Sequence, residues 1–152
     1  MDELRQFIHN ASKKTYASGD ENLRKKNDDG STTIVYEEGD YRYHDNYFGG
    51  EPYGGREVVF HKGKPLWMMV YYGWVVEGID SDEVYGILTK ALSNSALDMP
   101  YRGPKEYIDG DLKYVNNMEG DVENFKGEEK ILKGDTLLYT ARYIGGLVDR
   151  RG

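Results

Sequence analysis

The sequence predicts an α+β domain in which one helix followed by four antiparallel strands occurs twice. Three observations lead to this fold class. Two segments have helical spacing of apolar residues, short apolar runs alternate with glycine-containing turns, and the second half of the chain repeats motifs of the first. We expect roughly eight strands to form a strongly curved antiparallel sheet with both helices packed on it. The sequence leaves open whether the sheet closes into a barrel-like structure or divides into two separate layers.

Two amphipathic segments predict the helices. The first runs from Asp2 to about Tyr16, with the acidic Asp2 and Glu3 at the favourable N-terminal end. The second runs from Ser81, a suitable N-cap, to about Leu97. We expect these residues to face the core: Leu4, Phe7, Ile8 and Ala11 in the first helix, and Val84, Ile87, Leu88, Ala91 and Leu92 in the second.

The most apolar segment, residues 55–73, predicts a central β-hairpin. Its two apolar runs flank a turn in which Gly63 supplies positive φ. A three-residue turn from Lys62 to Lys64 gives the following pairs: Glu57 with Met69 and Val59 with Trp67 on one face, and Val58 with Met68 and Phe60 with Leu66 on the other. We name these the Trp67 face, which also carries Tyr71, and the Val58 face. The Val58 face is predicted to be ordinary core.

The other strands follow from short apolar runs between turn residues. Residues 18–31 are polar and predict a loop, and the glycine-rich residues 48–55 predict a connection because glycine weakens a strand interior. The remaining predicted strands are Thr32–Tyr36, Tyr41–Tyr47, Glu106–Ile108, Leu112–Asn116, Val122–Leu132 and Leu137–Ile144.

The two halves share motifs at a nearly constant spacing. The segment from Tyr36 to Tyr43 matches that from Tyr107 to Tyr114, and Gly63–Tyr72 matches Gly134–Tyr143. We therefore expect a single domain over residues 1–152, built from internal repeats at about 1–79 and 80–152.

Composition excludes several classes of protein. The 152 residues include no cysteine, which excludes disulfides and thiolate metal sites and favours a cytoplasmic location. A net charge of −7 argues against direct nucleic acid binding. No apolar run reaches the roughly 20 residues that a membrane-spanning helix needs, so we expect no membrane partner.

The candidate ligand-binding residues lie where the two halves differ. Trp67, Met69 and Tyr71 would correspond to Leu138, Thr140 and Arg142, and a closed sheet would place them around a cavity. Arg102 is a further candidate, because an arginine in the turn Pro100–Pro104 can clamp a carboxylate or phosphate. The predicted set is Glu57, Trp67, Met69, Tyr71, Arg102, Glu129 and Arg142.

Structural roles remain open for the same residues. The Trp67 face would equally pack against a helix or a second subunit, with Glu129 and Arg142 paired with each other. Arg102 would equally hold its own turn by hydrogen bonds to carbonyl groups.

No motif of a known chemistry is present. His9, His44 and His61 lack the spacing of metal ligands, so we expect neither a metal nor a cofactor. A nucleophile elbow and a phosphate-binding loop are also missing, which leaves the catalytic residues unknown.

Five strings carry a family resemblance: Tyr47–Glu51, Gly55–Val59, Pro65–Gly73, Pro100–Pro104 and Tyr143–Gly146. On them the chain resembles a prokaryotic family catalogued as a domain of unknown function, which more often has histidine where Ile144 stands. Relatives of that family also occur behind helix-turn-helix domains in transcription regulators. The resemblance therefore implies a sensory or interaction module.

Three functional hypotheses follow. The first is a small-molecule-binding or sensory domain, with a small-molecule ligand as its partner. The second is an enzyme that uses Glu57, Glu129 and Arg142 on a polar substrate. The third is an interaction module that forms a homodimer through the Trp67 face.

Overall fold

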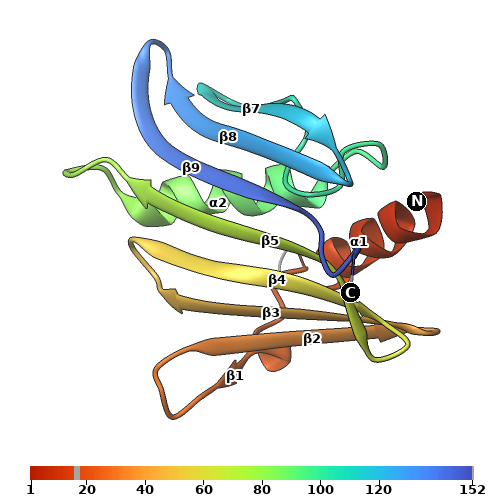
Figure 1. Cartoon of the computed structure of the whole chain (residues 1–152). Helices are drawn as coiled ribbons and strands as arrows, with labels where there is room; N and C mark the ends of the chain where they lie inside the picture. The colour runs from red at the N-terminus through yellow and green to blue at the C-terminus, as the bar shows by residue number, and fades with distance from the viewer. Residues whose placement is uncertain (16–17, 152) are drawn as a thin grey trace.

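A computed structural model describes residues 1–15 and 18–151 of the chain. In these ranges nine strands form one antiparallel sheet, in the order β1-β2-β3-β4-β5-β9-β8-β7-β6, and two α-helices lie on one of its faces (Figure 1). The strands are β1 (Lys25–Lys26), β2 (Thr32–Glu38), β3 (Tyr41–Gly49), β4 (Tyr53–His61), β5 (Lys64–Val75), β6 (Glu106–Asp109), β7 (Leu112–Asp121), β8 (Asn124–Lys133) and β9 (Thr136–Leu147).

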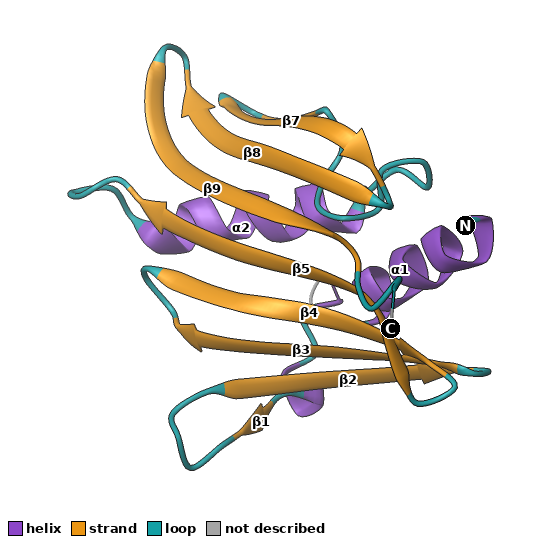
Figure 2. Cartoon of the chain, in the orientation of Figure 1, coloured by secondary structure: helices purple, strands orange, loops and turns teal. Residues whose placement is uncertain are grey.

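The sheet is continuous and open (Figure 2). Strands β5 and β9 pair antiparallel at its centre, from Trp67 opposite Leu147 to Val75 opposite Tyr139. The short strands β1 and β6 form its two edges. The predicted α+β class with an antiparallel sheet and two helices is confirmed, but closure into a barrel and division into two layers are both wrong. Pairing between β5 and β9 joins the halves into one sheet, and no pairing joins β1 to β6 among the described residues.

Helix α1 (Asp2–Lys14) has acidic residues in its first turn and Lys13 and Lys14 in its last, which suits both ends of the helix dipole. Its buried residues are those predicted: Leu4, Phe7, Ile8 and Ala11. Tyr16, the predicted end of this helix, lies outside the described residues.

Helix α2 (Ser81–Ser93) is capped by Asp80, whose side chain accepts a hydrogen bond of 2.9 Å from the backbone N–H of Asp82. The N-cap is therefore one residue earlier than predicted, and the helix ends at Ser93 rather than near Leu97. The five predicted apolar residues of α2 are all buried.

The β4–β5 hairpin has the predicted register except at its turn. Glu57 lies opposite Met69 and Val59 opposite Trp67, but a bulge after Val59 places Phe60 opposite Pro65 instead of Leu66. The turn contains two residues, Lys62 and Gly63, both with positive φ. Such two-residue turns match the twist of paired strands.

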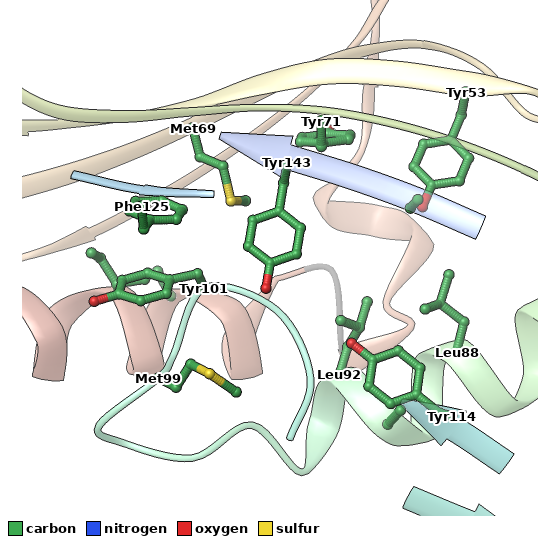
Figure 3. Packing of buried hydrophobic residues seen from close by; sticks show 14 of the residues in the cluster. Tyr53, Met69, Tyr71, Leu88, Leu92, Met99, Tyr101, Tyr114, Phe125 and Tyr143 are labelled. Atoms are coloured by element: carbon green, nitrogen blue, oxygen red, sulfur yellow. The ribbon is translucent and has the colours of Figure 1, made fainter. Parts of the chain in front are cut away.

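Both helices cover the Trp67 face. The prediction that the Val58 face is ordinary core is therefore wrong for Phe60, Leu66 and Met68, although Val58 itself is buried. Trp67 and Met69 are fully buried, whereas Phe60, Leu66 and Met68 on the other face are only partly buried. Figure 3 shows Met69 and Tyr143 of the sheet directed into the same interior as Leu88 and Leu92 of α2. We call the helix-covered side the inner face and the opposite side the outer face.

Most strand boundaries differ from the predictions by one to three residues, and β7 continues to Asp121 instead of ending at Asn116. Two predicted connections also contain strand residues. Residues 25–26, predicted as loop, form β1, and only residues 50–52 of the glycine-rich stretch connect β3 to β4. Gly54 and Gly55 lie inside β4 because side chains occupy the space beside them. A Cβ atom on Gly54 would lie 3.0 Å from the Tyr72 ring, and one on Gly55 would lie 2.7 Å from the Tyr71 hydroxyl oxygen. In the described part of the chain, neither helix has the length and apolar character required to span a membrane.

Candidate functional site

A pocket of about 510 Å³ opens on the inner face, between strands β3 to β5, helix α2 and the segment that follows α1. Four acidic side chains line it, and two of them lie on adjacent strands, Asp45 on β3 and Glu57 on β4. These residues are directly opposite each other across the two strands, so their side chains leave the same face of the sheet side by side. The pocket therefore contains a pair of neighbouring carboxyl groups.

A tyrosine hydroxyl contacts each carboxyl group of this pair. The Tyr71 hydroxyl donates to Oδ1 of Asp45 at 2.6 Å, and Asp45 is only 2% exposed. Glu57 interacts with the hydroxyl of Tyr43. Because both carboxyl groups also line the pocket, a ligand there would contact them.

Burial makes both carboxyl groups hold protons more tightly than usual. Burial and, after it, the charge of Asp45 raise the pKa of Glu57 to about 8, while Arg102 and Tyr43 oppose the rise. Burial also raises the pKa of Asp45 to about 6, against the hydrogen bond from Tyr71 and the charge of Arg102. Near neutral pH the pair therefore retains about one proton.

A buried ion pair lies beside the carboxyl pair. Arg102 donates from both Nε, at 3.0 Å, and Nη2 to Oε1 of Glu129. Its Nη2 also donates to the Tyr53 hydroxyl at 3.2 Å. Burial by itself lowers the pKa of Arg102, but Glu129, Tyr53 and Tyr139 together outweigh burial and raise this pKa above its usual value. The hydroxyls of Tyr114 and Tyr139 complete the shell around Glu129.

The turn from Pro100 to Pro104 is fixed by the strands beneath it. The backbone N–H of Gly103 donates to the Tyr114 hydroxyl at 3.1 Å, and its carbonyl accepts from Asn116 Nδ2 at 2.9 Å. A Cβ atom on Gly103 would lie 2.7 Å from the Tyr114 ring, so this close approach requires glycine. The predicted defined turn is present, and the carboxylate that Arg102 clamps belongs to the chain itself.

The structure brings four of the predicted site residues together. Glu57, Tyr71 and Arg102 line the pocket, and Glu129 lies directly behind Arg102. Trp67 and Met69 do not reach the pocket. Trp67 instead packs in a cluster with Phe125 and Tyr101, at centroid distances of 5.6 and 6.0 Å, and those two rings stack on each other at 4.3 Å.

The placement of Arg142 beside Glu129 is wrong. Arg142 lies on the outer face, with 70% of its side chain exposed, and its Nε donates to Glu128 at 2.8 Å. The prediction aligned Gly63 with Gly134, but Gly63 is the second residue of its turn and Gly134 is the first. A one-residue shift moves a strand residue to the opposite face. The inner positions of β9 therefore carry Tyr139, Ala141 and Tyr143.

Sequence reasoning missed Asp45 and its neighbour Tyr43. The signal was present, because an aspartate alternates with tyrosines in the strand 41–47 and therefore shares their face. A charge in the middle of a strand is usually solvent-exposed, which hid it.

A larger hollow of about 910 Å³ lies elsewhere, with walls that come mostly from exposed residues of the outer face, such as Val70, Tyr72 and Ile144. Because it contains no buried carboxyl pair, we assign the site to the smaller pocket. No group of three or more His, Cys, Asp or Glu side chains among the described residues is arranged to hold a metal ion.

Residues 45–148 match a family described as "Domain of unknown function (DUF5680)". The match covers more than half of the chain and includes Asp45, Glu57, Arg102 and Glu129. Comparison with curated proteins found no match. Comparison with solved structures found none either.

Proposed function

The chain belongs to the DUF5680 family, and we propose that it is a small-molecule-binding domain whose ligand occupies the pocket beside Asp45 and Glu57. One observation carries the proposal: two neighbouring carboxyl groups, Asp45 and Glu57, line the wall of a cavity, and Asp45 is only 2% exposed. Removing a carboxyl group from water costs free energy, and a ligand that forms a hydrogen bond with it offsets part of that cost.

The pocket has the make-up of a small-molecule site. Its volume falls within the roughly 300–1,000 Å³ that such sites occupy. Tyr53, Tyr71 and Tyr85 supply aromatic walls, and Asp45, Glu57 and Arg102 supply polar groups. A few convergent polar groups on an aromatic surface are typical of a site that orients one ligand.

The sensory role, the cytoplasmic location and the duplication belong to the same proposal. The absence of cysteine supports the location. The duplication draws support from the sheet order, in which β2 to β5 and β6 to β9 occupy corresponding positions on either side of the centre.

A fragment screen tests the proposal. We expect some compounds to raise the melting temperature of the wild type in a concentration-dependent way. Thr89→Phe places a ring in the pocket from α2 and should abolish these shifts whatever the charge of the compound. Glu83→Phe adds the same ring at an exposed position of α2 outside the pocket lining and serves as its control. Equal responses in wild type and Thr89→Phe would overturn the proposal.

Catalysis is the second candidate, because the pKa values of two neighbouring carboxyl groups lie near neutrality. Such a pair suits general acid and base roles. The residues would be Asp45 and Glu57 instead of the predicted Glu57, Glu129 and Arg142. An enzyme would lose turnover in Glu57→Gln while it still bound the compound, and unchanged turnover would exclude this role for Glu57.

The homodimer stays a prediction. The Trp67 face is covered by the helices of its own chain, so a dimer would use another surface. Sedimentation of the wild type at tens of micromolar concentration measures its oligomeric state directly, and a monomer there would contradict the prediction.

A further inference from the structure

Two sets of four side chains occupy corresponding positions in the sheet. The first, which we call the open quartet, comprises Tyr43, Asp45, Glu57 and Tyr71 on β3, β4 and β5. The second, the closed quartet, comprises Tyr114, Asn116, Glu129 and Tyr143 on β7, β8 and β9. In the open quartet Asp45 lies opposite Glu57, and in the closed quartet Asn116 lies opposite Glu129.

The contacts within the quartets also correspond. Tyr71 donates to Oδ1 of Asp45 at 2.6 Å, and Tyr143 donates to Oδ1 of Asn116 at 2.6 Å. Tyr43 interacts with Glu57 as Tyr114 does with Glu129. Tyr71 and Tyr143 lie opposite glycines, Gly55 and Gly127, in their hairpins. The two quartets therefore present the same shape and nearly the same polar groups.

The two quartets differ in the groups that contact them. In the closed quartet the guanidinium of Arg102 binds Glu129, and the backbone of Gly103 bonds to Tyr114 and Asn116. The open quartet faces the 510 Å³ pocket instead, and it carries a carboxylate, Asp45, where the closed quartet has the amide of Asn116. The closed quartet thus shows that this arrangement of side chains binds a guanidinium group.

We propose that the ligand of the open quartet carries a guanidinium group, which Asp45 and Glu57 bind as Glu129 binds Arg102. This inference rests on the proposed function and names the chemical class of its ligand. A planar cation with several N–H donors matches a pair of carboxyl groups, because it can donate to both at once.

The charges around the pocket favour a cation over an anion. Four acidic side chains line it against three basic ones. Of the basic three, Arg102 is paired with Glu129, and Arg24 is bonded to Glu21 at 2.9 Å. The charged lining residues outside these pairs are three acidic ones, Asp45, Glu57 and Asp82, and one basic one, Lys26. A bound carboxylate or phosphate would face two buried carboxyl groups, which disfavours it.

The test compares two isosteric probes, butylguanidinium and the neutral butylurea, by isothermal titration calorimetry on the whole chain. We expect butylguanidinium to bind at least about tenfold more tightly, since a charge-assisted pair contributes more than a neutral bond. Asp45→Asn should weaken its binding by about tenfold or more. This variant gives the open quartet the same composition as the closed one, so its hydrogen bond from Tyr71 is retained. Glu106→Gln removes an exposed acid outside the pocket lining and should bind like the wild type.

The outcomes separate this inference from the proposed function. If butylurea binds as tightly as butylguanidinium, or if Asp45→Asn and Glu106→Gln behave alike, the guanidinium inference is wrong. If only uncharged or anionic compounds bind, and Thr89→Phe abolishes their binding, the pocket is a ligand site without a preference for cations. If no compound of any charge binds, both proposals fail.

Discussion

Arg102 donates two hydrogen bonds to a single carboxylate oxygen of Glu129, and the two side chains are only 5% and 0% exposed. Removal of one partner leaves the other buried and unpaired, which typically costs about 3–5 kcal/mol. We therefore expect Arg102→Met to lower the free energy of unfolding by about that amount in urea titrations.

Two further variants test whether the loss comes from the unpaired charge. Arg102→Met combined with Glu129→Met should recover part of the loss, because no buried charge remains. Lys113→Met breaks the exposed pair of Lys113 with Glu106 and should change the free energy of unfolding by no more than about 1 kcal/mol. If Arg102→Met also lowers the free energy of unfolding by no more than about 1 kcal/mol, the result would contradict the buried ion pair.

The helices and the sheet could be predicted from the sequence because their signal is local. The apolar stripes of both helices follow from spacing alone, and so does most of the register of the central hairpin. The inner face could not be identified in this way, because both faces of the hairpin are apolar. Only the positions of the helices decide which face is covered.

The site was less accessible to sequence reasoning. The placement of Arg142 failed on a single position, the offset between the turns at Gly63 and Gly134, because a shift of one residue exchanges the faces of a strand. The pairing of Arg102 with Glu129 joins a loop to a strand 27 residues later, and no periodic pattern encodes that contact.

Stability should fall as the pH rises from 7 to 9. The folded state raises the pKa of Glu57 to about 8, mainly by burial, so in this range the folded chain binds more protons than the unfolded one. When the unfolded state binds fewer protons, the free energy of unfolding decreases with increasing pH. The groups that act on Glu57 are Asp45, Arg102 and Tyr43. His9 and His44 have lowered pKa values and act below this range.

Thermal unfolding at pH 7 and pH 9 measures the effect. We expect a loss of about 1 kcal/mol, or roughly 3 °C in melting temperature for a domain of this size. Glu57→Gln should remove this dependence and Glu106→Gln should retain it. If the melting temperature of Glu57→Gln falls between pH 7 and pH 9 as much as that of the wild type, another group titrates in this range.

Glycine at position 127 makes room for the Tyr143 ring. A Cβ atom there would lie 2.1 Å from Cζ of Tyr143, so Gly127→Ala should displace the ring and break its hydrogen bond to Asn116. Overpacking of this kind costs about 1–3 kcal/mol. Urea titration gives the cost, and an unchanged midpoint and slope would mean that the ring moves freely.

Gly86→Ala is the matched control, and its expected effect on the free energy of unfolding is opposite to that of Gly127→Ala. It lies exposed within α2, and no atom would lie within 4 Å of its added Cβ. Alanine is the better helix former, so Gly86→Ala should raise the free energy of unfolding by about 0.5–1 kcal/mol. Destabilisation by both alanines would indicate an effect unrelated to the Tyr143 contact.

The two tryptophans should respond differently to a collisional quencher. Trp67 is fully buried beside Phe125 and Tyr101, whereas Trp74 is partly exposed and lies near Arg142 on the outer face. Iodide does not reach a fully buried indole, so it should quench mainly the emission of Trp74. Trp74→Phe should therefore leave a fluorescence that iodide quenches little, while Trp67→Phe should leave one that it quenches readily.

The same experiment checks the corrected assignment of the faces. If the Trp67 face were exposed or lined the pocket, iodide would quench the Trp74→Phe variant as strongly as the wild type.

The indole N–H of Trp67 is the one buried side-chain polar atom of residues 1–15 and 18–151 without a hydrogen-bond partner. Trp67→Phe removes this unsatisfied donor but leaves a cavity, and cavity formation is the larger effect in a packed core. We therefore expect Trp67→Phe to be less stable than Trp74→Phe in parallel urea titrations, and the reverse order would contradict the packing around Trp67.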